Sequence, residues 1–312
     1  MPCFLSFLRP LRTQTQRNMI TYYNVADFLF SIEAEDSLFA SLTNYEPFRQ
    51  SIIDNRQSVL FAIHANSEPI PSTEGWTHVY TDTSDDDMPR IEMYSRNGEW
   101  LFLVSMSKEG EVVSAMRCSA DWSDVQLFIE TEYTRFAIDN AAMLVYAFAT
   151  ADKKTLLFHS SVTVRGGKGH MFLGHSGTGK STHSRMWLEA FEDAHLLNDD
   201  NPAVRILPDK EVRVYGTPWS GKTPCYINDS APVAALVQLA QAPENKIWRL
   251  RMSQAYPYIL ASVSGLKVLP DMMDALYETI AQLLELTPVY KLECLPNTEA
   301  AEVCCAEINR QS

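Results

Sequence analysis

Two patterns of hydrophobic and polar positions divide the chain. Between about residues 20 and 130, short segments alternate apolar and polar positions and are rich in aromatic and β-branched side chains, as in SVLFAIHA, EWLFLVSMS and DVQLFIE. Such alternation is typical of strands with one buried face. Turn-forming stretches such as SRNGEW and SKEGE separate the segments. The pattern predicts a strand-rich, antiparallel N-terminal region over residues 19–133.

The second pattern begins at residue 134. Residues 134–150, TRFAIDNAAMLVYAFAT, carry apolar residues at helical spacing and predict a largely buried helix. Further on, VAALVQLAQ and KIWRLRMS predict strands or strand–helix pieces, DMMDALYETIAQLLEL an amphipathic helix, PVYKLECL a strand and TEAAEVCCAEI a closing helix. Strands that alternate with helices predict an α/β (α+β) unit over residues 134–312.

Composition narrows the classes of partner. The chain has 312 residues and a formal net charge of −13, which argues against nucleic acid as a partner because phosphate binding needs a basic surface. Its six cysteines form no C-x-x-C pair, so we expect reduced thiols and a cytoplasmic location. The apolar run in residues 1–18 is too short to span a bilayer and lacks a cleavage site. We expect a disordered extension there, and no membrane partner.

One motif carries explicit chemistry. The stretch FLGHSGTGKSTHS, residues 172–184, has the spacing G-x-x-x-x-G-K-S between an apolar strand and a helix pattern. In such a loop the glycines let successive amides bind phosphate oxygens, the lysine neutralises the β- and γ-phosphates, and the next hydroxyl ligates Mg²⁺. The predicted nucleotide-binding residues are Gly174, His175, Ser176, Gly177, Thr178, Gly179, Lys180, Ser181 and Thr182.

A pair of carboxylates follows the next predicted strand. In AHLLNDDNPAV, Asp199 and Asp200 stand at the strand tip, where adjacent side chains point to opposite faces. One can hold the metal while the other acts as a base or hydrogen-bond partner. The alternative is a simple turn, because Asn, Asp and Pro also favour turns.

Together, FHSSV, MFLGHSGTGKSTHS and LLNDD resemble the P-loop core shared by HPr kinase/phosphorylase and phosphoenolpyruvate carboxykinase. In the carboxykinases a His-Cys-Ser stretch precedes G-x-S-G-T-G-K-T-T, and in the HPr kinases a His-Ala segment precedes G-x-S-G-x-G-K-S-E. An Asp-Asp pair follows in both. The similarity covers about residues 155–205 and implies a phosphoenolpyruvate carboxykinase-like P-loop kinase core with a mixed sheet.

The resemblance also implies roles for individual residues. Lys180 would contact phosphates and Ser181 would bind Mg²⁺, while Asp199 and Asp200 would act as metal ligand and general base. His159 would be a metal ligand or the partner of an aspartate. The alternative for His159 is a hydrogen-bonded histidine that merely ends the segment LLFHSS.

The chain also departs from these families. Thr182 replaces the glutamate that follows G-K-S in HPr kinases, and no arginine-rich segment for a protein substrate is evident. The chain is much shorter than a carboxykinase. It is therefore most similar to the wider HPr-kinase-like group, some of whose members phosphorylate serine in peptides or small molecules.

A second glycine-bearing loop, VYGTPWSGKTPCY, resembles Gly-Thr-Pro-Trp turns of HPr-kinase-like proteins. Lys222 in this loop can reach the γ-phosphate or the acceptor as a mobile charge. Trp219 either covers a base or substrate, or caps the core.

These features predict an ATP-dependent phosphotransferase, a kinase that acts on a hydroxyl of serine in a peptide or of a small molecule and uses Mg²⁺. The alternative is a non-catalytic nucleotide-binding module that recognises a partner, and a carboxykinase-type enzyme is a third choice. ENKIW lacks the aspartate of the guanine-reading N-K-x-D motif. The sequence leaves open the choice of ATP or GTP, the acceptor, the reverse reaction and whether the chain forms an oligomer.

Overall fold

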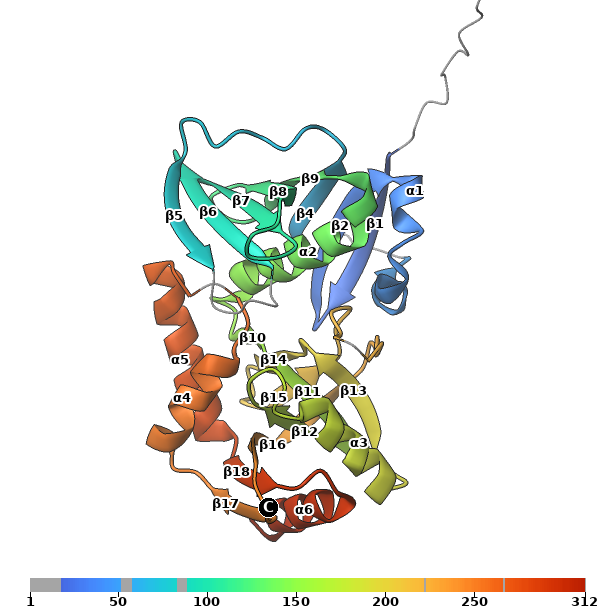
Figure 1. Cartoon of the computed structure of the whole chain (residues 1–312), viewed down its shortest axis with the longest axis vertical. Helices are drawn as coiled ribbons and strands as arrows, with labels where there is room; N and C mark the ends of the chain where they lie inside the picture. The colour runs from blue at the N-terminus through green and yellow to red at the C-terminus, as the bar shows by residue number, and fades with distance from the viewer. Residues whose placement is uncertain (1–17, 52–57, 83–88, 222, 266, 312) are drawn as a thin grey trace, which may run out of the picture.

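The computed structural model describes residues 18–51, 58–82, 89–221, 223–265 and 267–311. Over these ranges the protein is a strand-rich α/β fold with two mixed sheets, one formed by each half of the chain (Figure 1). The first strand begins at Asn18, the last residue of the expected extension. Residues 1–17 lie outside the described residues.

The N-terminal sheet has the strand order β3-β1-β2-β4-β9-β8-β7-β6-β5. Its strands are β1 (Asn18–Val25), β2 (Phe28–Glu35), β3 (Arg49–Gln50), β4 (Val59–Asn66), β5 (Thr77–Asp82), β6 (Arg90–Arg96), β7 (Glu99–Ser105), β8 (Val112–Cys118) and β9 (Asp124–Ile129). The alternation correctly predicted the strands. The expected all-antiparallel pairing is wrong at the centre, because β4 pairs in parallel with both β2 and β9.

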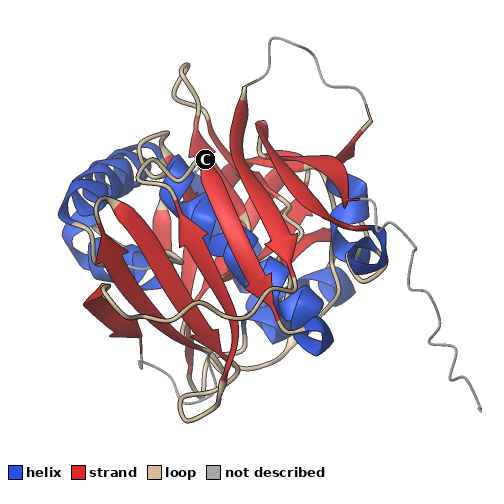
Figure 2. Cartoon of the chain, turned by 90° about the horizontal axis from the view of Figure 1, so that it is seen from above, coloured by secondary structure: helices blue, strands red, loops and turns tan. Residues whose placement is uncertain are grey.

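Two long connections allow these parallel pairs, since parallel neighbours need a crossover. The first connection runs from β2 to β4 and contains α1 (Asp36–Phe39) and the short helix η1 (Thr43–Phe48). The second contains β5 to β8, which return the chain to β9 beside β4. Seen from above, the connection from β4 to β5 crosses the outer face of the sheet (Figure 2).

After the turn η2 (Thr131–Tyr133), α2 (Thr134–Thr150) covers the inner face of the N-terminal sheet and lies between the two sheets (Figure 1). The helix coincides with the predicted one. It is apolar on most sides because its neighbours come from both halves: the cluster around it includes Phe61 and Phe102 of the sheet and also Ala203 and Trp219. The helix therefore packs against both halves of the chain, on either side of the expected boundary at residue 134.

The C-terminal sheet has the order β10-β14-β15-β16-β12-β11-β13, and β18 and β17 follow on the other side of β16. Its strands are β10 (Thr155–Leu157), β11 (Ser160–Arg165), β12 (Lys168–Leu173), β13 (His195–Asp200), β14 (Ala203–Ile206), β15 (Val212–Tyr215), β16 (Ser230–Gln241), β17 (Lys246–Arg249) and β18 (Val289–Cys294). The long strand β16 pairs antiparallel with β15 near its start and in parallel with β12 and β18 further on.

Helices cover both faces of this sheet. On one face lie α4 (Met252–Ser262) and α5 (Pro270–Leu286), and on the other lie α3 (Lys180–Ala190) and α6 (Thr298–Gln311). The sequence predicted the last two helices of the chain and β18, but it did not resolve α4 as a helix. Pro257 lies inside α4 on its exposed side, and an internal proline normally argues against a helix.

Two sequence expectations concern the whole chain. The cysteines within the described ranges are free thiols. Among the helices of the described residues, none combines the length and apolar character that crossing a membrane requires.

Candidate phosphate-binding and acid–base site

Strand register brings three distant motifs to one edge of the C-terminal sheet. β11 lies between β12 and β13, and Ser160, its first residue, stands opposite Leu173 on one side and Asp200 on the other. His159, which precedes Ser160, and Gly174, which follows Leu173, therefore start at the same edge. The carboxyl ends of β12 and β13 point the same way, because both strands run antiparallel to β11. This is the edge at which open α/β sheets bind ligands.

The phosphate loop has the backbone conformation that its glycines allow. Gly174, Gly177 and Gly179 have φ values of 153°, 78° and 108°, a region that other residues rarely adopt. At Gly174 a Cβ atom would also lie 3.0 Å from the side chain of Thr178. The chain then enters α3, whose first helical bond runs from the His183 amide to the Gly179 carbonyl. The amides of residues 180–182 precede that bond, so they can bind an anion.

Lys180 lies over this loop. Its Nζ donates hydrogen bonds to the carbonyls of Gly174 at 2.9 Å and His175 at 3.4 Å. Burial lowers the pKa of Lys180, while the nearby carboxylates of Asp200 and Asp199 oppose that shift because they favour the charged ammonium. The ammonium thus lies between the phosphate loop and the aspartate pair.

The first turns of α3 are fixed by buried polar contacts. Trp187 is fully buried, and its Nε1 donates to Nε2 of His183 at 3.1 Å. Burial lowers the pKa of His183 to about 4, so this histidine is neutral and accepts that bond. Ser184 shares a buried hydroxyl hydrogen bond with Ser161 of β11. His183 therefore anchors the helix in the core, where its ring also packs against Phe172.

The two aspartates differ in environment. The Asp200 side chain is 35% exposed, and its Oδ1 lies 3.5 Å from Nε2 of His159. Burial raises the pKa of Asp200 to about 6, although Lys180 and Asn201 pull it down and Asp199 adds to the increase. A carboxylate with this pKa is a stronger base than an ordinary aspartate and is still mostly ionised at neutral pH.

Asp199 lies deeper, with 6% of its surface exposed. Its charge adds to the burial that raises the pKa of the Cys225 thiol to about 11, so Cys225 lies nearby. The sequence predicted that the aspartates face opposite sides of the strand. The structure places Asp200, not Asp199, against His159.

Three polar residues that the sequence did not point to complete the candidate site. Asn201 donates from Nδ2 to Oδ2 of Asp200 at 3.0 Å, and its own Oδ1 accepts a bond from the Ser264 hydroxyl at 2.6 Å. Gln241, at the end of β16, donates from Nε2 to the Gly177 carbonyl at 3.3 Å. The second asparagine of NDDN was a possible signal for Asn201, whereas Ser264 and Gln241 come from segments without a motif.

In the second glycine-bearing loop, Trp219 has a structural role. Trp219 is 4% exposed and belongs to the cluster around α2, so it caps the core and does not cover a substrate. The Gly221 amide donates to the Asp199 carbonyl at 3.1 Å, which holds the loop against the aspartate pair. Lys222 lies outside the described residues.

The side chains fit Mg²⁺ only in part. The oxygens of Ser181, Asp199 and Asp200 are hard donors of the kind that Mg²⁺ prefers. However, the residues that the structure describes contain no group of three or more His, Cys, Asp or Glu that could hold a metal by itself. The described side chains alone therefore do not form a complete metal site.

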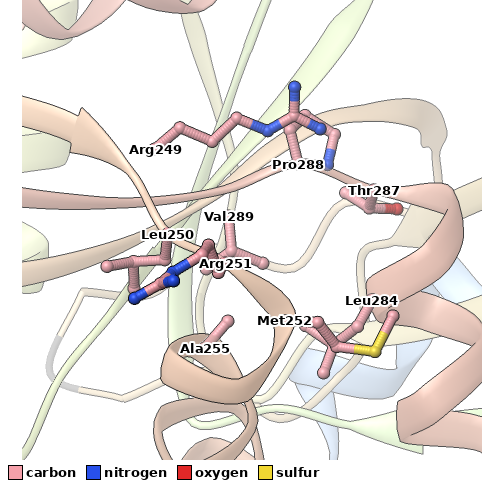
Figure 3. A pocket seen from close by; sticks show the side chains of 9 residues that line it. All are labelled: Arg249, Leu250, Arg251, Met252, Ala255, Leu284, Thr287, Pro288 and Val289. Atoms are coloured by element: carbon pink, nitrogen blue, oxygen red, sulfur yellow. The ribbon is translucent and has the colours of Figure 1, made fainter.

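The cavity drawn in Figure 3 is a separate feature. Its volume is about 410 Å³, and it lies among Arg249 and Arg251, the start of α4 and residues 287–289. Those last residues lead into β18, which is parallel to β16 and β12. The cavity is therefore at the opposite edge from the phosphate loop. The side chains of Arg249 and Arg251 extend to different sides (Figure 3), so the arginines do not form a convergent anion site.

No protein-family model matches the sequence, and no curated protein matches it.

Proposed function

We propose that this chain is an ATP-dependent phosphotransferase of the HPr-kinase-like type that acts on a hydroxyl group. The observation that supports this most is the strand register around Ser160, which brings the phosphate loop to the same edge as His159 and Asp200. A glycine-rich loop alone indicates only phosphate binding. Phosphate transfer to a hydroxyl also needs a group that accepts the hydroxyl proton. Asp200, whose pKa is raised by burial, lies beside the loop and can accept it.

Each part of the site has its own role in the proposed transfer. The amides of residues 174–182 and the ammonium of Lys180 bind and neutralise the β- and γ-phosphates. Asp200 accepts the proton of the acceptor hydroxyl as its oxygen forms a bond to the γ-phosphorus, and the bond from that phosphorus to the β–γ bridging oxygen breaks, leaving ADP. His159 and Asn201 each contact one oxygen of Asp200 and orient the carboxylate.

Mg²⁺ would be held by Ser181 and by Asp199 or Asp200 together with the phosphates, and when bound it would neutralise charge on the transferring group. The buried position of Asp199 suits a ligand role better than a base role, since the proton acceptor must reach the acceptor hydroxyl. The acceptor is a serine in a peptide or a small alcohol.

The alternative is a nucleotide-dependent binding module without transfer. It is favoured by the size of the N-terminal sheet, which has as many strands within the described residues as the sheet that carries the phosphate loop. A sheet of this size offers a surface that can recognise a partner without any phosphate transfer.

A transfer screen distinguishes the two. The chain is incubated with Mg²⁺ and ATP labelled at the γ-phosphate, against amino acids, small alcohols and serine-containing peptides, with Lys180→Ala as the blank. A phosphotransferase yields labelled acceptor together with stoichiometric ADP. Binding of ATP with no ADP formed under any acceptor would instead support the module, and absence of nucleotide binding would contradict both.

A further inference from the structure

A single loop connects the aspartate pair to the N-terminal half of the molecule. We call residues 216–229, between β15 and β16, the bridging loop; residue 222 is not among its described residues. Its inner side follows the tip of β13, where the Gly221 amide donates to the Asp199 carbonyl at 3.1 Å and Ser220 forms an isolated bridge with Asp200. β13 is the last strand on this side of the sheet, so the loop supports an edge that no further strand supports.

Side chains strengthen this inner contact. Thr217 donates from its hydroxyl to the Asn201 carbonyl at 2.7 Å. Asn198 donates from Nδ2 to the Thr217 hydroxyl at 3.2 Å, and its Oδ1 accepts the amide of Asp200 at 3.0 Å. One buried asparagine therefore joins the bridging loop to the backbone of Asp200.

The outer side of the bridging loop is held by the N-terminal half. Trp219 donates from Nε1 to the hydroxyl of Tyr45 at 3.2 Å and packs edge-on against Tyr146 of α2 at 5.2 Å between ring centroids. Asn44 donates from Nδ2 to the Pro218 carbonyl at 3.0 Å. Tyr45 and Asn44 belong to η1 and are fully buried.

Two further contacts hold the second part of the bridging loop. Arg135 of α2 donates from Nη2 to the Tyr226 hydroxyl at 2.7 Å, and Asn228 donates from Nδ2 to the Pro47 carbonyl at 3.0 Å. The loop is thus fixed to η1 and α2 along its length. It has hydrogen bonds on both sides, towards the N-terminal half and towards the aspartates.

We propose that the N-terminal half positions the aspartate pair through the bridging loop, with Asn44 and Tyr45 as positioning residues. Transfer requires the base to be held closely in place relative to the acceptor and the γ-phosphate. An edge strand that ends in two carboxylates needs support from outside its sheet, and the bridging loop supplies it. The effect on catalysis rests on the proposed phosphotransferase activity, whereas the effect on the loop itself does not.

The first test uses Tyr45→Phe in the full chain, with Tyr23→Phe as the matched control. Tyr23 packs against Tyr45 with ring centroids 5.2 Å apart and is equally buried. Its hydroxyl has no hydrogen bond to the described part of the bridging loop. Hydrogen–deuterium exchange is measured for peptides that cover residues 216–229 and β13. We expect exchange about fivefold faster in Tyr45→Phe than in Tyr23→Phe, the factor for the one hydrogen bond that the loop loses, with the N-terminal strands unchanged. The variant also removes the bond of Tyr45 to Asp139 of α2, which does not contact the loop through that bond.

A second variant keeps the test decisive if Tyr45→Phe folds poorly. Asn44→Ser removes the Nδ2 group that donates to the Pro218 carbonyl and to Oδ1 of Asp139, and it should accelerate exchange in the same peptides. With the acceptor found in the transfer screen, both variants should lower kcat about fivefold and leave KM for ATP within about twofold. A general loss of stability would instead scale with the folded fraction and would appear in Tyr23→Phe as well.

The outcomes separate the two proposals. If exchange over residues 216–229 is the same in Tyr45→Phe, Asn44→Ser and Tyr23→Phe, the positioning role is wrong whatever the activity. If exchange rises but kcat is unchanged, the loop is held as described and the catalytic consequence is refuted. If no acceptor is phosphorylated and Lys180→Ala binds nucleotide normally, the proposed function fails while the exchange result still decides the role of the loop.

Discussion

The two sheets have the same number of strands within the described residues. The C-terminal sheet differs in that its candidate site residues lie together at one edge. In the C-terminal sheet β12, β13 and β16 all end at the same edge, and each supplies a polar element there: the phosphate loop, the aspartate pair and Gln241. The parallel pairs of the N-terminal sheet lie at its centre, and their inner face is covered by α2.

The N-terminal sheet has its own histidine between carboxylates. Nδ1 of His64 lies 2.7 Å from Glu33 and Nε2 lies 3.3 Å from Asp124, so three neighbouring strands each contribute one group. This cluster lies along β2, β4 and β9, whereas the glycine-rich loop belongs to the other sheet. The His159–Asp200 pair is the candidate catalytic pair because strand ends place it beside the glycine-rich loop proposed to bind phosphate.

The largest expected effect is on transfer in Asp200→Asn. Removal of a general base typically lowers the rate about 10²- to 10⁴-fold, and the amide preserves the shape of the side chain. ATP binding should persist because the loop amides and Lys180 remain. Initial rates of acceptor phosphorylation and the Kd for ATP are measured for Asp200→Asn and, as its partner, Asp199→Asn. If Asp200→Asn retains full activity, Asp200 is not the base.

A matched pair of core truncations compares the sheets directly. Phe61 of β4 stacks on Phe30 at 4.9 Å, and Phe172 of β12 packs against Trp187 and His183 of α3. Either phenylalanine changed to alanine should lower the free energy of unfolding by about 3–5 kcal/mol, because both are fully buried.

Only Phe172→Ala should also weaken ATP binding by the folded protein, since its ring supports the helix that follows the phosphate loop. Urea unfolding and ATP titration measure the two effects separately. Equal ATP affinity in Phe61→Ala and Phe172→Ala would mean that the support beneath α3 does not matter for the loop.

The two histidines provide a smaller contrast. His159→Ala should lower transfer about tenfold because Asp200 loses the group that orients it. His64→Ala should leave transfer within about twofold. Both histidine–carboxylate pairs are partly exposed, with histidine side chains 40% and 34% exposed, so each variant should change stability by less than about 1 kcal/mol. The same loss of transfer in both would indicate a common indirect cause.

Local features were predictable from the sequence, and long-range contacts were not. The alternation in SVLFAIHA and the spacing in residues 134–150 depend on neighbours along the chain, so β4 and α2 follow from them. The parallel pairing of β4 with β9 depends on where β5 to β8 return the chain, and no local pattern encodes it.

The candidate site divides in the same way. The glycine-rich loop and the aspartates were evident because the chemistry proposed for them needs particular residues at fixed spacing. The contact of Asn44 with the Pro218 carbonyl joins residues 174 positions apart, and Asn44 stands in an ordinary polar segment. Support for a site can come from any buried donor of the right shape, so its sequence signal is weak.

The smallest effect concerns stability and pH in the protein without nucleotide or Mg²⁺. The pKa of Asp200 is about 6 in the folded chain, above the ordinary value of 3.8. The folded state therefore holds this proton more tightly than the unfolded state. Its stabilising contribution is complete below about pH 4 and is lost as the pH rises through about 6. Because the side chain is 35% exposed, the loss should be about 1 kcal/mol.

Asp200→Asn removes this titration. Urea unfolding at pH 4.5 and pH 7.5 should therefore show wild type losing about 1 kcal/mol relative to Asp200→Asn as the pH rises. Asp124→Asn is the control in the N-terminal sheet, because its carboxylate also lies beside a histidine but is 59% exposed. If wild type instead gained stability relative to Asp200→Asn, the Asp200 carboxylate would be stabilised as the anion, and the burial that makes it a strong base would be absent.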